Sequence, residues 1–193
     1  MRKIIAVIGD GTIEEGSKKE AIAIATGKAL VDAGYRVQSG GMGGIMRATF
    51  KGAKSSEKAQ DGDTIALLPT FGKYSANEYA DIVIPTGLDV MRNALVANAS
   101  AVVAIGGGAG TLNEMSFAWS FKKLIIAYDN VDGWSQKLAG TRIDNKTRYE
   151  NIPLEEDRVF AVSSPEEVVK ILGEKIDLYN GYHHGIGNEY EHR

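Results

Sequence analysis

The sequence contains no cysteine, and its three histidines all lie within the last eleven residues. The absence of thiols excludes disulfides, thiolate metal sites, iron–sulfur clusters and cysteine nucleophiles. Because no histidine lies in the body of the chain, a catalytic triad or a histidine-ligated zinc site is also excluded there. The pair His183-His184 could catch a metal, but we interpret residues 181–193 as a polar tail.

The chain also lacks an excess of positive charge and any long apolar segment. Its 22 basic and 25 acidic residues give a net charge of -3, which argues against a nucleic-acid-binding surface. The first apolar run is too short for a signal peptide or a membrane span, so we expect a cytoplasmic protein without a membrane partner. With 193 residues, of which 44% are hydrophobic, and with no internal repeat, we expect one domain over residues 1–180.

Short apolar runs alternate with helix-like patterns along most of the chain. The runs predict strands at residues 3–8, 35–38, 64–69, 81–85, 101–105, 124–128 and 158–162. The helical patterns cover residues 17–33, 45–54, 88–99, 111–121 and 165–179, and residues 129–157 are expected to be irregular. Continuous apolar strands are typical of a parallel sheet covered on both faces. The sequence therefore predicts a Rossmann-like, doubly wound α/β fold with about seven strands.

Three glycine-rich loops follow predicted strands: Gly9-Asp10-Gly11, the segment SGGMGG at 39–44, and the segment GGGAG at 106–110. Ligands of a doubly wound sheet lie beyond the carboxyl ends of the strands. Glycines let an anion approach the backbone, and a helix that begins near Thr111 offers free N–H groups and a positive dipole end. We therefore expect a phosphate or another anion here, with tight strand-to-helix packing as the alternative. The loops match neither a P-loop nor the dinucleotide fingerprint.

Two charged residues are candidates for this site. Glu114 lies one helical turn beyond Thr111, so it could act as a general base on whatever the loop holds. The same pair also has the spacing of a capping box. Arg92 follows the fourth strand and could bind a phosphate bidentately, or could be a solvated surface arginine. The apolar face expected for its helix is Leu88, Met91, Leu95 and Ala99.

Three segments, GGGAGTLNE, SGGMGGIM and DVMRNALV, resemble motifs of the Lonely Guy family. The first is similar to that family's Pro-Gly-Gly-x-Gly-Thr-x-x-Glu signature, the second to its earlier glycine loop, and the third to its arginine-bearing helix. The resemblance runs in order from Lys3 to Tyr128. It extends to a bacterial and archaeal branch that also resembles the molybdenum cofactor carrier protein.

The resemblance implies a phosphoribohydrolase, from a family once labelled lysine decarboxylase-like, that needs no cofactor. Water would cleave the N-glycosidic bond of a nucleoside 5'-monophosphate through an oxocarbenium-like transition state, releasing base and ribose 5-phosphate. Arg92 would orient the substrate, and Glu114 would activate water or stabilise the developing charge. The implied ligand-binding residues are Gly9, Asp10, Gly40, Gly41, Gly43, Gly44, Met91, Asn93, Gly106, Gly107, Gly108, Gly110 and Thr111.

The same resemblance keeps a second class of function open. In a carrier, the glycine loops would hold the phosphate of molybdenum cofactor, or a nucleotide, without turnover, and Glu114 would be a cap or a polar contact. Two departures bear on this choice: Gly106 replaces the signature proline, and Asn93 stands where the family usually has a second positive charge. The resemblance also implies a homodimer or homotetramer, with the aromatic residues of 117–121 as candidate contacts.

Overall fold

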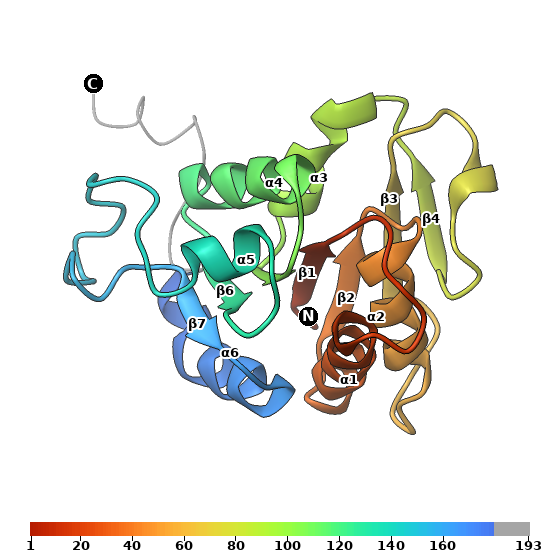
Figure 1. Ribbon diagram of the computed structural model, residues 1–193, viewed down its shortest axis with the longest axis horizontal. Coiled ribbons are helices and arrows are strands. Elements are labelled where there is room, and N and C mark those ends of the chain that lie inside the picture. The colour runs from red at the N-terminus through yellow and green to blue at the C-terminus, as the bar shows by residue number, and fades with distance from the viewer. Residues whose placement is uncertain (180–193) are drawn as a thin grey trace.

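The computed structural model describes residues 1–179, and its strands form one parallel sheet (Figure 1). The strands are β1 Ile4–Gly9, β2 Arg36–Ser39, β3 Thr64–Leu68, β4 Ile82–Pro85, β5 Ala101–Ile105, β6 Leu124–Tyr128 and β7 Phe160–Val162. Their order is β4-β3-β2-β1-β5-β6-β7, and every neighbouring pair is parallel. The predicted fold is thereby confirmed. The order reverses between β1 and β5, which is where such a sheet opens its ligand crevice. The histidines of the tail lie outside the described residues.

Helices cover both faces of the sheet. They are α1 Lys18–Asp32, α2 Gly44–Lys54, α3 Asn93–Ala97, α4 Ala109–Ser120, α5 Trp134–Leu138 and α6 Pro165–Tyr179, with short 3-10 helices η1 Lys73–Ser75 and η2 Asp89–Arg92. Helices α1, α2 and α6 pack on one face, and α3 and α4 on the other (Figure 1). Strand β1 serves both cores, because Ile5 and Val7 point to the first and Ala6 and Ile8 to the second. Within residues 1–179, no helix is long and apolar enough to cross a membrane.

Helices α1 and α2 cross at two glycines that face each other's backbone. A Cβ on Gly27 would overlap the carbonyl oxygen of Thr49, and a Cβ on Gly52 would overlap that of Ile24. The close crossing therefore requires glycine on both helices, although glycine is a poor helix former. It also sets the position of α2, whose first residue, Gly44, ends the second glycine loop.

The prediction for residues 88–99 is wrong in two respects. The segment is a 3-10 turn followed by the short helix α3, because the backbone enters it in the left-handed conformation at Gly87 (φ 65°) and Asp89 (φ 48°). Of its expected apolar face, Ala99 is buried, but Leu88, Met91 and Leu95 are not. The buried side chains are Arg92, Asn93, Val96, Ala97 and Ala99, and the exposed ones are Leu88, Val90, Met91 and Leu95.

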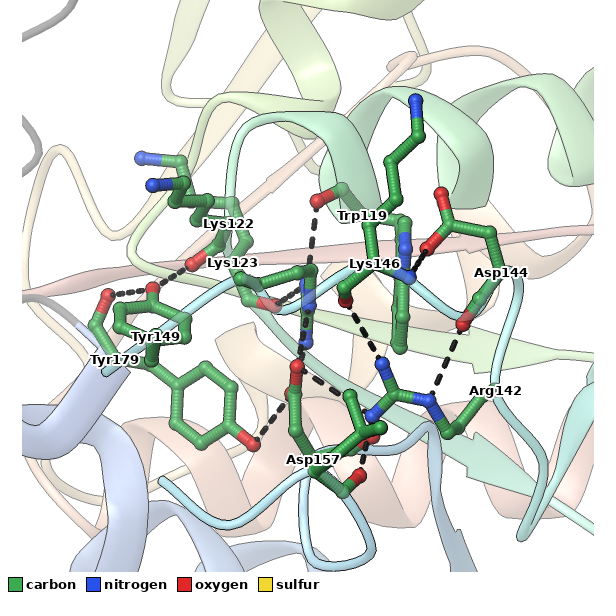
Figure 2. Close-up of polar contacts among 11 residues, drawn as sticks. Trp119, Lys122, Lys123, Arg142, Asp144, Lys146, Tyr149, Asp157 and Tyr179 are labelled. Carbon is green, nitrogen blue, oxygen red and sulfur yellow. Dashed lines mark hydrogen bonds and ion pairs between the residues drawn. The ribbon is translucent and has the colours of Figure 1, made fainter. Parts of the chain in front are cut away.

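A buried ion pair anchors the segment of 129–157, where the structure adds the short helix α5. Arg148 donates from Nε to Asp157 Oδ2 (2.8 Å), and its Nη2 donates to the other carboxylate oxygen. Its Nη1 donates to the carbonyl groups of Trp119 and Lys123 (both 3.2 Å), in the last turn of α4 and just beyond it. Figure 2 labels Trp119, Lys123 and Asp157. The guanidinium also lies 3.6 Å from the centroid of the Trp119 ring. The irregular segment thus holds the C-terminal end of α4 in place. Trp119, one of the aromatic residues named as candidate subunit contacts, is buried in the core of this chain.

We expect Gly52→Ala to destabilise the protein by roughly 2 kcal/mol, because the added methyl group pushes α2 away from α1. The control is Gly173→Ala in α6, where an added Cβ would meet nothing within 4 Å. That change should stabilise by about 0.5–1 kcal/mol through helix propensity. Chemical denaturation measures both free energies of unfolding. Equal effects of the two changes would contradict the close crossing.

Arg148→Met should lower the free energy of unfolding by about 3–5 kcal/mol, because it leaves the Asp157 carboxylate buried without its cation. Lys28→Met is the matched control. Lys28 pairs with Asp32 on the exposed surface of α1, so its loss should cost less than about 1 kcal/mol. A loss for Arg148→Met as small as that of the control would show that the buried pair does not hold the segment.

Candidate functional site

The three glycine loops meet at the switch point because Asp10 bonds to both of the others. Its backbone carbonyl accepts from the N–H of Ile45 (2.9 Å), at the start of α2. Its carboxylate accepts from the N–H of Gly107 (3.0 Å), in the third loop, and from Lys19 Nζ (2.8 Å). The loop at Gly44 approaches so closely that a Cβ there would overlap Asp10 O. The sequence-based expectation that the loops share one edge is confirmed.

Two glycines of the cluster that precedes α4 have a structural role. The N–H of Gly106 donates to Ser135 Oγ (2.8 Å), and the N–H of Gly107 donates to Asp10. The two carbonyl groups accept from Ser135 N (3.0 Å) and Trp134 N (2.9 Å). Both glycines have left-handed φ values, 64° and 96°, and a Cβ on Gly106 would overlap the Asp10 carboxylate. These two amides are therefore occupied and cannot form the phosphate cradle that we expected of them.

The free amides lie one step further along the chain. Gly108 is the N-cap of α4 without a side-chain cap, and the bond from Leu112 N to Gly108 O (3.0 Å) closes the first turn. The N–H groups of Ala109, Gly110 and Thr111 precede that bond and so have no partner within the helix. A Cβ on Gly108 or Gly110 would meet nothing within 4 Å. The positive end of α4 therefore faces open space. The capping-box alternative fails, because Thr111 lies inside the helix rather than at its N-cap.

Arg92 and Glu114 face each other beside these amides. The distance from Arg92 Nη1 to Glu114 Oε1 is 3.5 Å, and the two side chains are only 8% and 10% exposed. Neither side chain makes a hydrogen bond within residues 1–179, and Arg92 Nε is buried without a partner. Gly40 makes room for the guanidinium, since a Cβ there would lie 2.7 Å from Nη1. The alternative of a solvated Arg92 is thereby excluded.

Burial dominates the ionisation of this pair. It raises the pKa of Glu114 to about 7, against the opposing attraction of Arg92. Burial also lowers the pKa of Arg92, and the charge of Glu114 only partly offsets it. The carboxyl therefore titrates near neutral pH, where it can take or give a proton.

These groups line a cleft of about 370 Å³, here called the Arg92 cleft. Of the expected site residues, it brings together Gly9, Asp10, Arg92, Asn93, Gly108, Gly110, Thr111 and Glu114. It does not include Gly40, Gly41, Gly43, Gly44, Met91, Gly106 and Gly107, which support the loops or, as Met91 does, face solvent. Sequence reasoning missed Gly11, Met42 and Met46. The two methionines lie in or beside the glycine loop, but apolar side chains carry no site signal in a sequence.

No metal-binding cluster accompanies the cleft. Over the described range, 1–179, no three histidine, aspartate or glutamate side chains gather in a way that could hold a metal ion. The polar neighbour of the pair is instead an amide contact, in which Asn93 Nδ2 donates to Asn113 Oδ1 (3.0 Å). The cleft thus offers one guanidinium, one titratable carboxyl, free amides and a soft thioether wall. That set suits an anionic group attached to a heterocycle.

Known proteins share this architecture. Residues 2–169 match the model of the SLOG cluster4 family. An uncharacterized protein from Archaeoglobus fulgidus is 37% identical over 115 residues, which are 59% of this chain and 72% of that protein. The molybdenum cofactor binding protein of the phototrophic bacterium Rippkaea orientalis is similar with a TM-score of 0.72 and 29% identity, over 91% of this chain and 98% of that one. The molybdenum cofactor carrier protein of Chlamydomonas reinhardtii has a TM-score of 0.70 over 92% and 99% of the chains. At 23% identity it supports the fold alone.

Anion binding at the Arg92 cleft should weaken as pH rises, because ionised Glu114 competes for Arg92 and repels the anion. Sulfate is the probe, since its own charge does not change near neutral pH. With a pKa of about 7 for Glu114, its dissociation constant should rise up to about tenfold between about pH 6 and about pH 8. Isothermal titration calorimetry measures this change.

Glu114→Gln should abolish most of that pH dependence, whereas Glu57→Gln, a change at an exposed surface carboxylate, should leave it intact. The sign follows from linkage. Sulfate binds more tightly when the Glu114 carboxyl is protonated and neutral. Its affinity is therefore highest below the pKa of Glu114 and falls as pH rises through that pKa. Sulfate affinity that is independent of pH in the unchanged protein would contradict the assigned interaction.

Proposed function

This chain belongs to the SLOG cluster4 family, and its cleft holds an arginine without hydrogen bonds beside the free amides at the start of α4. We propose that it binds a phosphate-bearing ligand of the molybdenum-cofactor type. The ligand is held without turnover, as cargo. One observation supports this most: the Arg92 side chain is buried, makes no hydrogen bond within the described residues, and has its ion-pair partner Glu114 at 3.5 Å, beyond a close contact. Removing a charge from water without compensation is costly, and an anionic ligand would supply the compensation.

The residues of the cleft fit the phosphate end of such a ligand. Arg92 would bind two oxygens, and the amides of Ala109, Gly110 and Thr111 would approach a third at the positive end of α4. Open space at Gly108 and Gly110 leaves room for that approach. The heterocycle would lie against Met42 and Met46, whose polarizable thioethers adapt to flat rings. The volume of about 370 Å³ lies within the usual range for small-molecule sites.

The structural relatives support the same choice. The protein from Rippkaea orientalis is named for molybdenum cofactor binding, and its likeness extends over nearly the whole of both chains.

Gly106 stands where the Lonely Guy signature has proline, and this difference has a local cause in this chain. Gly106 has a left-handed φ of 64°, which proline cannot adopt, and the Asp10 carboxylate lies in the space that a side chain would occupy.

A second candidate is a phosphoribohydrolase acting on a nucleoside 5'-monophosphate, and the ionisation of Glu114 favours it. A buried carboxyl with a pKa of about 7 can act as a general base or acid. Arg92, 3.5 Å away, would hold the phosphate or orient the ribose. In this reaction the N-glycosidic bond would break and the base would leave with the electron pair of that bond. Glu114 would take a proton from water as the water oxygen bonds to C1' of the ribose, and that proton would then pass to the departing base.

We further propose a homodimer or homotetramer. Large apolar side chains are exposed in the region of 71–95. They are Phe71, Tyr74, Ile82, Ile84, Leu88, Val90, Met91 and Leu95. Extended apolar patches are rare on monomers. The patch includes the exposed edge strand β4, which a partner would cover. Sedimentation equilibrium measures the mass of the assembly.

The deciding experiment pairs two assays on purified protein. Calorimetric titration with molybdenum cofactor should show binding, and Arg92→Met should weaken it by about 10–100-fold through the loss of charge-assisted hydrogen bonds. Arg47→Met is the matched control, because Arg47 pairs with Glu78 at the surface of α2. Incubation with nucleoside 5'-monophosphates should release no ribose 5-phosphate.

Glu114→Gln separates the two candidates. At about pH 6, where Glu114 with its pKa of about 7 is mostly protonated, a binding protein should keep its affinity within about threefold, because the glutamine preserves shape and polarity. An enzyme should instead release ribose 5-phosphate and lose that activity with the change. Cofactor binding that Arg92→Met leaves intact would overturn the assignment of the cleft.

A further inference from the structure

Beside the ion pair of the Arg92 cleft lies a second pair of side chains, and this pair is neutral. Asn93 Nδ2 donates to Asn113 Oδ1 (3.0 Å). Asn93 directly follows Arg92 in the sequence, and it lines the cleft with only 6% of its surface exposed. Asn113, half-buried in α4, directly precedes Glu114 and does not line the cleft. The proposed phosphate site accounts for the ion pair but leaves the adjoining amide pair unexplained.

The side-chain amide of Asn93 has hydrogen-bonding capacity that the protein does not use. Such an amide offers two N–H donors and a carbonyl oxygen with two lone pairs. Within residues 1–179, the bond to Asn113 is the one hydrogen bond that this side chain makes. One N–H and the oxygen therefore remain for a ligand. The oxygen is not sealed off by protein atoms, although Asn93 as a whole is buried.

The amide pair is not needed to hold α3 in place, because other contacts do so. Gln38 of β2 donates from Nε2 to the carbonyl groups of Val96 (3.0 Å) and Leu95 (3.3 Å). The side chains of Val96 and Ala97 are also fully buried in the core that α3 and α4 form with the sheet. The bond to Asn113 therefore has a narrower effect. It sets the rotation of the Asn93 amide, and with it the direction in which the oxygen points.

A fixed amide suits a different part of a ligand from the part that Arg92 suits. A neutral amide binds an anion more weakly than a guanidinium does, because its hydrogen bonds are not assisted by charge. Its N–H and oxygen together instead match the edge of a heterocycle on which an acceptor lies beside a donor. Asparagine binds the edge of adenine in this way. Pterin-type rings, like that of molybdenum cofactor, carry such an edge where a ring C=O adjoins a ring N–H.

We propose that Asn93 binds the heterocycle of the ligand whose phosphate lies at the start of α4, and that Asn113 is the positioning residue that fixes the Asn93 amide for it. This inference rests on the proposed function, which supplies the position of the phosphate. The ligand class is thereby narrowed to phosphate esters whose ring has a hydrogen-bond acceptor beside a donor. Inorganic phosphate lacks the group that Asn93 recognises.

The test compares two probes, molybdenum cofactor and inorganic phosphate, by calorimetric titration. The measured quantity is the preference for the cofactor, which is the ratio of the two dissociation constants. Asn93→Leu and Asn113→Leu should each lower this preference by about 5–10-fold, because a hydrogen bond to the ring is lost or misdirected. Affinity for inorganic phosphate should stay within about twofold, which also shows that the variants are folded. Ser116→Ala, at an exposed residue of α4, is the control and should change neither quantity.

Asn113→Asp separates positioning from packing. Its carboxylate still accepts from Asn93 Nδ2, whereas the leucine of Asn113→Leu does not. The added negative charge should weaken the binding of both anionic probes, so the preference for the cofactor should stay within about threefold of that of the unchanged protein. A preference that falls as far in Asn113→Asp as in Asn113→Leu would show that Asn113 does not act through this bond, and would overturn its role.

Free pterin and 3-methylpterin test the ring edge, because the methyl group of the second replaces the ring N–H. Pterin should displace the cofactor at least about fivefold more effectively than 3-methylpterin does. Equal displacement would overturn the assigned edge. A preference for the cofactor that survives both leucine changes would overturn this inference alone, since phosphate binding that depends on Arg92 would still support the proposed function. If molybdenum cofactor does not bind to the unchanged protein, both proposals fail.

Discussion

Asp10 is the constraint on which the site depends, because one residue holds three loops together. Its carbonyl group fixes the start of α2 through Ile45, and its carboxylate fixes the loop before α4 through Gly107. Lys19 pairs with that carboxylate at the edge of the Arg92 cleft. The close approach explains why the neighbouring loops carry glycine where they touch Asp10. Without the bonds of Asp10, the loops that follow β1, β2 and β5 would lie at the same edge of the sheet but would not be held together around one cleft.

The buried pair of Arg92 and Glu114 is better explained by ligand binding than by stability. Two charges that leave water are stabilised only when hydrogen bonds satisfy their remaining donors and acceptors. Here the pair stands 3.5 Å apart and neither side chain is hydrogen-bonded within the described residues. Folding therefore tolerates a locally unfavourable arrangement, and the surrounding core compensates for it. Such an arrangement is typical of a site that a ligand completes.

The four glycines before α4 divide into two pairs with different physical roles. Gly106 and Gly107 adopt left-handed conformations, and their amides bond to Ser135 and Asp10. Gly108 and Gly110 have ordinary space around them and expose the first turn of the helix. A glycine cluster thus fits both alternatives that its sequence suggests, close packing in its first half and, as we propose, access for an anion in its second.

The sequence by itself determined the doubly wound fold, because apolar strands alternate with helical patterns along the whole chain. It also determined that Glu114 follows the glycine cluster by one turn, since a helix fixes that spacing. Only the tertiary structure decided which face of residues 88–99 is buried. The apolar stripe predicted an inward face of Leu88, Met91, Leu95 and Ala99. Only Ala99 of these is buried, and Arg92 and Asn93 point inward in place of the other three. Local periodicity records the average preference for burial, whereas the pairing of Arg92 with Glu114 arises between segments that only the folded sheet brings together.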